Sequence, residues 1–443
     1  MDTSPLWTIG LDFVERYTFE NSTVWAEVLS SMSQSSLAKA WQPLKIGSIT
    51  LRNAFIKAAT NENMSRKGIP TRAMLEHHRE LAEGGVGMST MAYLAVEKTG
   101  RTLADQIWLR PDILPELRAV TDAVHEAGGK IAAQITHGGS FVTGTFVPAP
   151  LKSASGGINA AGLLCGNVLR RAMNTHDMDA MVDRFVEGAE LCVEAGFDAV
   201  EIHMGHGYLL NQFISPMDNR RKDEFGGCAE NRVRFPARVL RAVKDAVGDR
   251  IAVLAKINVD DGRSRGAHVE DAIVTAQALQ EAGADMLVLS GGRNVESNWF
   301  TFGSSMNLDA MMKVIGKWTL TGIAVASTAK TAPKIAFKEL YFWDYSTQIR
   351  AAVSMPLAYI GGVKTTDNVA QIMEGGFEAV VMGRALLREP DLVNRWQETP
   401  EKPSQCDSCN SCLAYIYHPA GTWCIHRPAN VLAKNLIPAS EVA

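Results

Sequence analysis

The stretch MDAMVDRFVEGAELCVEAGFDAVEIH, residues 178–203, decides the fold. Its first part carries apolar residues at spacings of three and four and ends at Gly196, which predicts an amphipathic helix with a glycine stop. Its second part, FDAVEIH, is a short apolar run and predicts a buried strand. A helix that leads directly into a buried strand is the repeating unit of parallel α/β folds.

The same unit recurs from Ile56 onward. Eight strand-like runs alternate with amphipathic segments, and no hairpin signal lies between them; they are AFIKAA, VGMSTMAYL, KIAAQI, FDAVEIH, IAVLAKIN, ADMLVLS, PLAYIGG and EAVVMGR. Strands that are separated by helices need right-handed crossovers and therefore lie parallel. Eight such units close into a barrel, so we predict an α/β fold of the (β/α)8 TIM-barrel type.

Two regions interrupt the rhythm. Residues 141–174, after the third strand, are rich in Gly, Ala, Ser and Pro, and residues 293–345, after the sixth, are too long for a plain connection. The second region predicts a lid or an added helical excursion. We assign residues 1–38 to an N-terminal extension, residues 39–402 to the barrel and residues 403–443 to a Cys-rich C-terminal tail.

The composition limits the functional class. The chain has 443 residues, of which 46% are hydrophobic and 21% charged, with a net charge of -4, so we expect an ordinary globular protein that acts on a small molecule and binds neither nucleic acid nor membrane. The odd number of cysteines and the absence of a signal peptide favour a reduced, cytoplasmic setting. The cysteines are Cys165, Cys192, Cys228, Cys406, Cys409, Cys412 and Cys424. A homo-oligomer is left open.

The active site of such a barrel lies at the carboxyl ends of its strands. The residues at these ends predict a site for a flat, polar, phosphorylated ligand; they are Ala58, Ala59, Thr60, Asn61, Gln134, His137, His203, His206, Lys256, Ser290 to Gly292, Gly361, Gly362, Gly383 and Arg384. Glycines after the seventh and eighth strands indicate a phosphate site, because backbone N–H groups approach a phosphate most closely where side chains are absent. Tight turns are the alternative explanation for these glycines.

Two histidines and a tyrosine follow the fourth strand. His203 and His206 can both donate hydrogen bonds to one substrate oxygen, and Tyr208 can supply a proton. Satisfied core histidines and a metal pair are the alternatives. Because no carboxylate or third histidine would complete a metal shell, we predict catalytic groups and no metal here.

These residues carry a resemblance. HMGHGYLLNQFISPMDNRRKDEFGG, residues 203–227, with the following ENRVRF, resembles the signature of the old yellow enzyme family of flavin-dependent oxidoreductases. LRNAFIKAATNEN, AAQITHGG and VMGRALLREPDL are similar to three further segments of that family. The resemblance covers about residues 44–394, and it is closer to the 2,4-dienoyl-CoA reductase-like branch than to the yeast type.

The resemblance implies an ene-reductase with non-covalently bound FMN, reduced by NADH or NADPH and reoxidised by an electron-poor alkene. His203 and His206 would hold the activating oxygen of the substrate and Tyr208 would protonate its alpha carbon, while hydride passes from flavin N5 to the beta carbon. The implied cofactor contacts are Ala58, Ala59, Thr60, Asn61, Gln134, Lys256, Gly292, Gly361, Gly362, Gly383 and Arg384.

Three positions depart from the family pattern. Lys256 stands where many members have arginine, and it lacks the bidentate fork of a guanidinium. Ser140 also replaces a frequent arginine, and Asn61 replaces a Thr or Cys, which puts the family's redox tuning in question. By contrast, the opposite charges of Arg221 and Asp223, together with the Asn219 amide, predict an ion-pair and hydrogen-bond brace of the loop rather than catalysis.

The tail contains four closely spaced cysteines. CDSCNSCLAYIYHPAGTWC, residues 406–424, resembles the iron–sulfur segment of the larger dienoyl-CoA reductases, but its middle spacing is one residue short and no second flavin domain follows. We therefore favour reduced thiols over a [4Fe-4S] cluster or structural zinc at Cys406, Cys409, Cys412 and Cys424. The tail is expected to close the base of the barrel or to contact a partner subunit.

Two other functions remain open. One is an FMN-assisted isomerase or dehydrogenase of secondary metabolism that uses the same site without net consumption of NAD(P)H. The other is a flavin-binding protein without turnover, against which the joint presence of His203, His206 and Tyr208 argues. The substrate itself is not predicted, since the two long loops shape its pocket.

Overall fold

Eight parallel strands form a closed barrel in the computed structural model, which describes residues 34–142, 150–159, 167–316, 319, 322–323, 325–327, 332–427 and 438–441. Their order in space follows their order in the sequence, which confirms the predicted TIM barrel. The strands are β3 (Phe55–Lys57), β6 (Met88–Ala95), β7 (Lys130–Thr136), β11 (Ala199–Met204), β12 (Ala252–Asn258), β13 (Met286–Ser290), β14 (Leu357–Ile360) and β15 (Ala379–Met382). Most of the predicted N-terminal extension, and Cys165, lie outside the described residues.

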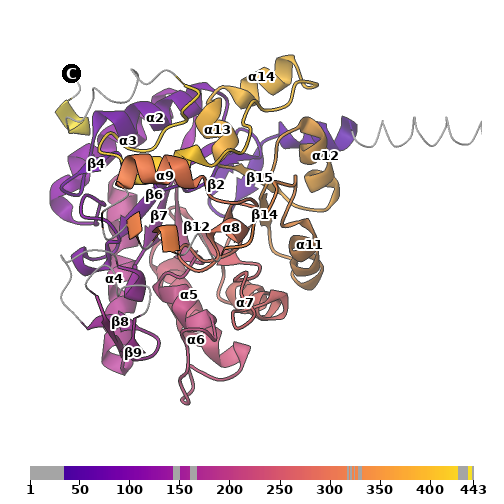
Figure 1. Ribbon diagram of the computed structural model, residues 1–443. Helices are drawn as coiled ribbons and strands as arrows, with labels where there is room; N and C mark the ends of the chain where they lie inside the picture. Colours follow the sequence, from indigo (N-terminus) through magenta and orange to yellow (C-terminus); the bar gives the residue numbers. More distant parts are fainter. Residues whose placement is uncertain are drawn as a thin grey trace, which may run out of the picture.

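Helices surround the barrel (Figure 1). They are α2 (Arg72–Glu83), α3 (Leu114–Glu126), α4 (Thr175–Glu194), α6 (Ala229–Val247), α7 (Val269–Glu281), α11 (Trp343–Ala352), α12 (Thr366–Glu374), α13 (Arg384–Arg388) and α14 (Leu392–Glu398). Two of them begin with a capping residue whose side chain accepts a backbone N–H of the first turn. Asn174 accepts the Asp177 N–H at the start of α4, and Thr365 accepts the Asn368 N–H at the start of α12. Short η turns occur at Lys98–Gly100, Pro111–Ile113 and Gly139–Phe141.

The barrel strands alternate between two apolar layers. On β11, Ala199 belongs to the cluster inside the barrel, whereas Val200 and Ile202 pack outward against the helices. The inner cluster also contains Ile46 and Leu51, from the hairpin of β1 (Leu44–Ile46) and β2 (Ile49–Leu51). This apolar hairpin packs against the barrel interior. The polar residues that could bind a ligand lie at the carboxyl end of the strands.

One further hairpin was not predicted. Between the first barrel strand and its helix, β4 (Ser65–Arg66) pairs antiparallel with β5 (Ile69–Pro70). The turn places Lys67 at φ 51° and Gly68 at φ 74°. Tight hairpin turns need positive φ at both central residues, and lysine gives no such signal in the sequence because Asn or Asp usually fills the first position.

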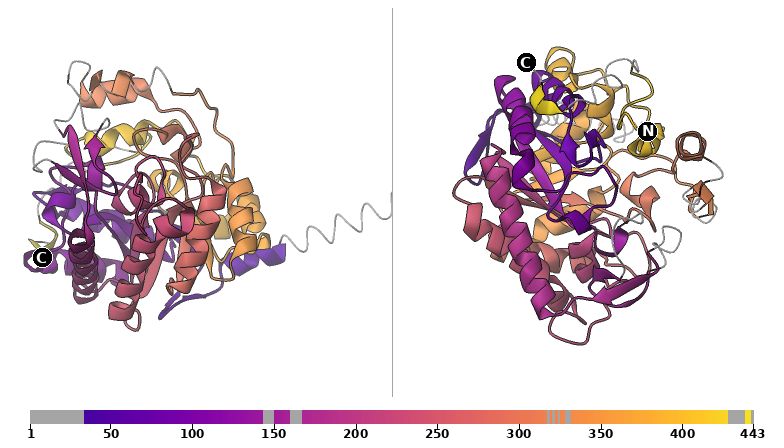
Figure 2. Two further views of the ribbon diagram at one scale, coloured as in Figure 1. Left: turned by 90° about the horizontal axis from the view of Figure 1, so that it is seen from below. Right: turned by 90° about the vertical axis from the view of Figure 1, so that its left-hand side faces the viewer.

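The two long insertions form structures of their own. After β7 the described residues contain β8 (Leu151–Ser153), β9 (Gly157–Ile158) and β10 (Leu169–Ala172), in the order β8-β10-β9. After β13 the chain forms α8 (Asn298–Thr301) and α9 (Leu308–Ile315), which confirms a helical excursion. Helix α5 (Leu209–Ile214) follows β11, and the tail adds turns η5 (Ser411–Tyr417) and η6 (Ala439–Glu441). Turn η5 packs against α9, and Figure 2 shows the tail and the excursion on the same side of the barrel.

Within the part of the chain that the structure describes, no helix combines the length and the apolar character needed to cross a membrane.

His77 on α2 is buried without a hydrogen-bond partner at either ring nitrogen among the described residues. Burial, aided by Lys57 and Arg427, holds its pKa well below the usual value. We expect His77→Leu to raise the free energy of unfolding by ~1–3 kcal/mol, because an unsatisfied polar group is removed. The gain should be larger at pH 5 than at pH 8, since the unfolded state binds a proton below pH ~6.5 and the folded state does not.

Urea unfolding at the two pH values measures this gain. His176→Leu is the matched control, because His176 is exposed near the start of α4. A gain for His77→Leu that shrinks on acidification would contradict the burial of a neutral imidazole.

Candidate active site

A cavity of about 400 Å³ lies at the carboxyl ends of the barrel strands, within the size range of small-molecule sites. Most of the residues predicted from the strand ends line it: Ala58, Ala59, Thr60, Asn61, Gln134, His203, His206, Tyr208, Lys256, Ser290, Gly361, Gly362, Gly383 and Arg384. No Asp or Glu is among its described lining residues. The cavity is therefore suited to a neutral or anionic ligand.

Three predicted strand-end residues do not line the cavity: His137, Gly291 and Gly292. Gly292 has φ 81°, and its carbonyl oxygen accepts a hydrogen bond from Asn258 at 2.8 Å, so it shapes the loop after β13 instead of contacting the cofactor space. A side chain there would also collide with Thr301. His137 is buried and its Nε2 lies 3.0 Å from Glu97, which makes it a loop brace.

His203 and His206 face one another at the end of β11. Their ring centroids are 4.9 Å apart and their planes nearly perpendicular. His206 adopts φ 58°, held by a hydrogen bond from its N–H to Asn258 at 3.1 Å and by Ser290, whose Oγ lies 2.8 Å from Nε2. His203 Nδ1 accepts the Gly205 N–H at 3.3 Å, so its proton is on Nε2. His203 Nε2 and His206 Nδ1 have no partner among the described residues and remain for a ligand.

Both imidazoles are held neutral. Burial, with a contribution from neighbouring His206 and Lys256, lowers the pKa of His203 well below its usual value. Burial and Lys256 lower the pKa of His206 to about 3. A neutral imidazole donates one hydrogen bond without carrying a charge into the site.

This leads to a prediction about pH. The dissociation constant for cyclohex-2-enone should show no histidine inflection between about pH 5 and pH 8, because neither ring gains a proton in that window. Calorimetric titrations across the range measure it. An inflection near pH 6.5 that disappears in His206→Asn would show that the ring titrates in the folded protein.

Tyr208 is the N-cap residue that precedes α5 and lies beside the two imidazoles. Its ring centroid is 4.5 Å from that of His203 and 5.3 Å from that of Tyr93 on β6. The Asn294 amide donates to the Tyr208 hydroxyl oxygen at 3.2 Å. Burial, reinforced by Tyr93, raises the pKa of Tyr208 well above its usual value, whereas the Asn294 bond lowers it. The hydroxyl therefore stays protonated throughout the neutral range and can act as an acid.

A buried charge network lies beneath the cavity. Glu201 on β11 accepts a hydrogen bond from Gln134 Nε2 at 2.6 Å and forms an ion pair with Lys256 Nζ at 2.9 Å. Gln134 Nε2 is turned to Glu201, and the Gln134 amide oxygen has no hydrogen-bond partner among the described residues, so it can accept a hydrogen bond from a ligand. Sequence reasoning missed Glu201, although an acid inside the apolar run FDAVEIH, in phase with Ala199 and His203, was a usable signal.

A second buried pair was also missed. Lys57 forms an ion pair with Glu62, and both side chains are almost fully buried. Thr60 Oγ1 accepts from Lys57 at 3.0 Å and bonds to Glu62 at 3.1 Å, and Glu62 also accepts the Ala92 N–H at 2.9 Å. Burial is the largest influence on both, lowering the pKa of Lys57 and raising that of Glu62. The pair fixes the loop after β3, which lines the cavity.

The predicted phosphate end combines glycines with cations. Gly362 has φ 78°, and a Cβ there would come within 2.8 Å of the Leu340 backbone nitrogen, so only glycine fits. A Cβ on Gly383 would project towards Ala58 and Thr60 at 3.7 Å, into the cavity end that bare backbone leaves open. Lys364 and Arg384 also line this end. Arg384 donates to the Asn410 side chain and to the Phe302 carbonyl at 2.8 Å. These groups fit a phosphate, although Arg384 must share its donors.

The latter part of the signature forms the predicted brace. Arg221 pairs with Asp223 and donates to the carbonyl oxygens of Ala154 and Met173 at 3.0 and 2.7 Å. The Asn219 amide donates to the Phe213 carbonyl at 2.7 Å. These residues do not line the cavity, so their work is to hold the loop.

The tail lies at the carboxyl end of the barrel and not at its base, which corrects one expectation. Cys406 and Cys412 line the main cavity. Both also line a small adjoining cavity together with Cys409 and Cys424, and none of the four forms a disulfide. The sequence placed these cysteines in a separate tail because spacing alone does not show where the tail packs.

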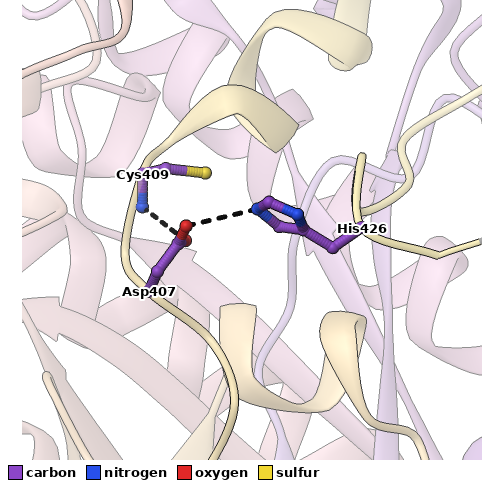
Figure 3. Close-up of side chains that lie close together, drawn as sticks. All are labelled: Asp407, Cys409 and His426. Atoms are coloured by element: carbon purple, nitrogen blue, oxygen red, sulfur yellow. Dashed lines mark hydrogen bonds and ion pairs between the residues drawn. The ribbon is translucent and has the colours of Figure 1, made fainter.

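Asp407 and His426 border this cysteine site (Figure 3). The Asp407 carboxylate accepts the Cys409 N–H at 3.0 Å and lies 3.2 Å from His426 Nε2. The ligand atoms of these three residues lie within 4.8 Å of one another, a spacing that a metal ion could bridge. The hydrogen bonds of Asp407 explain why the three side chains lie close together. Asp407 and His426 therefore link the two halves of the cysteine segment.

The comparisons with known proteins agree with this geometry. The model of the NADH:flavin oxidoreductase / NADH oxidase family matches residues 39–299. The chain is 36% identical over 410 residues to a 4,4'-dithiodibutanoate disulfide reductase of Rhodococcus erythropolis, covering 91% of this chain and 98% of that protein. It is 26% identical over 371 residues to an NADH oxidase of Thermoanaerobacter brockii, covering 83% of this chain but only 52% of that relative. The chain thus spans about half the length of some relatives.

Solved structures show the same fold. A 2-naphthoyl-CoA reductase superposes with a TM-score of 0.73 at 21% identity, covering 88% of this chain and 57% of that chain. Morphinone reductase superposes with a TM-score of 0.65 at 23% identity, covering 84% and 92%. These structural similarities show the fold, whereas the family match and the relative that aligns over almost its full length show the family. The chain belongs to the NADH:flavin oxidoreductase / NADH oxidase family, which includes the old yellow enzymes.

Proposed function

We propose that this chain is an FMN-dependent NAD(P)H oxidoreductase that reduces the activated C=C bond of an α,β-unsaturated carbonyl or related compound. The observation that carries the proposal is the convergence of two neutral imidazoles and a protonated tyrosine in a cavity without lining carboxylates. Bound FMN would supply the hydride, which the side chains of the protein cannot provide.

The chain's own residues would then divide the remaining tasks. His203 Nε2 and His206 Nδ1 would donate hydrogen bonds to the activating oxygen of the acceptor and withdraw electron density from the double bond. Tyr208 would transfer its proton to the alpha carbon. Gln134 and Lys256, oriented by Glu201, would contact the polar edge of the flavin, and the loop after β3 would support its ring. Gly361, Gly362, Gly383, Lys364 and Arg384 would hold the phosphate.

The test begins with the purified protein. Its visible spectrum should show bound flavin, and anaerobic NADH or NADPH should bleach that spectrum; added cyclohex-2-enone should restore it. A colourless protein that takes up no FMN on reconstitution would refute the proposal. Turnover of a substrate without consumption of NAD(P)H would instead favour the isomerase, and bleaching without reoxidation by any acceptor would favour a flavin-binding protein.

A second acceptor class has a specific observation behind it. The relative that matches almost the whole chain is named for the reduction of 4,4'-dithiodibutanoate. No described carboxylate lines the cavity, so it presents no like charge that would repel a dicarboxylate disulfide. Offering this disulfide and cyclohex-2-enone to the reduced protein in parallel, and comparing the rates at which the flavin spectrum returns, distinguishes the two.

We further propose that Cys406, Cys409, Cys412 and Cys424 hold an iron–sulfur cluster. Spacing alone favoured free thiols, but the structure brings all four side chains around one small cavity without disulfides. Iron and acid-labile sulfide in the wild type, both lost in Cys412→Ser, are the expected results; wild-type protein without iron after anaerobic purification would favour thiols.

A further inference from the structure

Turn η5 of the C-terminal tail forms part of the wall of the active-site cavity. Leu413, Ile416 and Tyr417 lie on this turn and line the cavity. Leu413 and Ile416 are only half-buried, and Tyr417 is 40% exposed. Apolar side chains that line a cavity and are only partly covered by protein are available to a ligand.

The chain after this turn is tied to the loop that follows β3. Thr422 donates its hydroxyl to the Asn61 carbonyl at 2.7 Å and its N–H to the Glu62 carbonyl at 2.8 Å. Gly421, at φ 87°, packs so closely that a Cβ would lie 2.6 Å from Met64 Cγ. Since Asn61 itself lines the cavity, the tail and the predicted flavin-contacting loop form one continuous surface.

The start of the turn is tied to the excursion after β13. Asn410, which is buried, donates to the Ser304 hydroxyl at 2.8 Å and to the Ser305 carbonyl at 3.0 Å. Asn307 donates to the Ser411 hydroxyl at 3.0 Å. Inside the tail, the Tyr415 and Trp423 rings pack in a tilted arrangement with centroids 4.0 Å apart. Turn η5 is therefore fixed at both ends, and its side chains have a defined place in the wall.

The proposed acid, Tyr208, lines the same cavity as turn η5. Tyr208 is surrounded by aromatic rings, with Phe141 and Tyr93 centroids both 5.3 Å away. Tyr417 also contributes to the raised pKa of Tyr208. A substrate with its activating oxygen on His203 and His206 would thus extend between Tyr208 and η5.

We propose that Ile416 and Tyr417 determine substrate specificity by contacting the part of the acceptor remote from its activating oxygen and so limiting its bulk. The inference rests on the proposed function, because it assumes that the acceptor oxygen binds at the two histidines. It assigns to the cysteine segment a role in selecting substrates that is separate from any metal it holds.

The test makes the side chains of the cavity wall both smaller and larger. With cyclohex-2-enone as the small probe and 4-phenylbut-3-en-2-one as the bulky one, Ile416→Ala and Tyr417→Ala should each raise the bulky-to-small ratio of kcat/KM about 10-fold, the size of effect that a few carbon atoms have in an apolar pocket. Ile416→Phe should lower the ratio by a similar factor. Ile158→Ala is the matched control, since Ile158 on β9 is 67% exposed and lies outside the cavity.

The dissociation constants of both probes, measured by calorimetry, show whether the proposed ene-reduction or the proposed role of turn η5 has failed. If the wild type reduces neither probe, the proposed ene-reduction fails, while a shift of the binding ratio in opposite directions for Ile416→Ala and Ile416→Phe still supports the wall. If both ratios stay within twofold of the wild type in all three variants, the inference is overturned even when the enzyme reduces enones. Ile416→Phe preserves the test should either alanine variant fail to fold.

Discussion

Tyr208→Phe is expected to slow reoxidation of the reduced enzyme by cyclohex-2-enone by ~10²- to 10⁴-fold, the usual contribution of a positioned general acid. The substitution removes only the hydroxyl, which accepts a hydrogen bond from Asn294, and leaves the ring between His203 and Tyr93. Reduction by NAD(P)H needs no proton from this group and should change little. Anaerobic stopped-flow spectroscopy of the two half-reactions measures both rates.

Tyr345→Phe is the matched control for this loss. Tyr345 lies on α11 and does not line the cavity, so removal of its hydroxyl should leave reoxidation unchanged. Equal slowing of both half-reactions by Tyr208→Phe would contradict its assignment as proton donor and indicate a general disturbance of the cavity.

Glu201→Leu is expected to lower the free energy of unfolding by ~3–5 kcal/mol, the range for a buried ion pair that loses one partner. Lys256 and Glu201 are both almost completely buried, and the substitution leaves the ammonium group inside the barrel without a countercharge. It also removes the acceptor of the Gln134 amide. Denaturant unfolding of the flavin-free protein measures the loss without a contribution from cofactor binding.

The double substitution Glu201→Leu/Lys256→Met provides the internal test. Removing both charges should recover most of the lost stability, since two apolar side chains can replace a buried pair at little cost. Glu187→Leu on α4 is the exposed control: Glu187 pairs with Arg184 where both side chains are more than half exposed, and a change of ~0–1 kcal/mol is expected. A double variant no more stable than Glu201→Leu would show that the pair is not the source of the loss.

The barrel was predictable because its signal is local and repeated. Each strand is a short apolar run and each helix has its own period and stop, so eight independent segments led to the same fold. The histidines, Tyr208 and the late glycines were predictable for a related reason, since parallel strands bring their carboxyl ends to one edge. Gly292 shows the limit of this rule: it also follows a strand, but a turn carries it away from the cavity.

The missed residues are charged groups whose burial the sequence does not show. No segment of sequence contains both members of the Glu201–Lys256 contact. Lys57 and Glu62 are only five residues apart, but their pairing matters because both side chains are buried. The cysteine tail was assigned to the base of the barrel or to a partner, yet Thr422 and Asn410 fasten it beside the cavity through residues more than 100 positions away.

The sequence by itself thus determined the barrel, the edge at which the candidate site lies and the groups expected to act there, because hydrophobic period and strand-end position are properties of short segments. Only the tertiary structure decided the charge network beneath the cavity, the neutral state of the histidines and the place of turn η5. Those features depend on burial and on contacts between segments distant in the chain, and both are set only when the chain has folded.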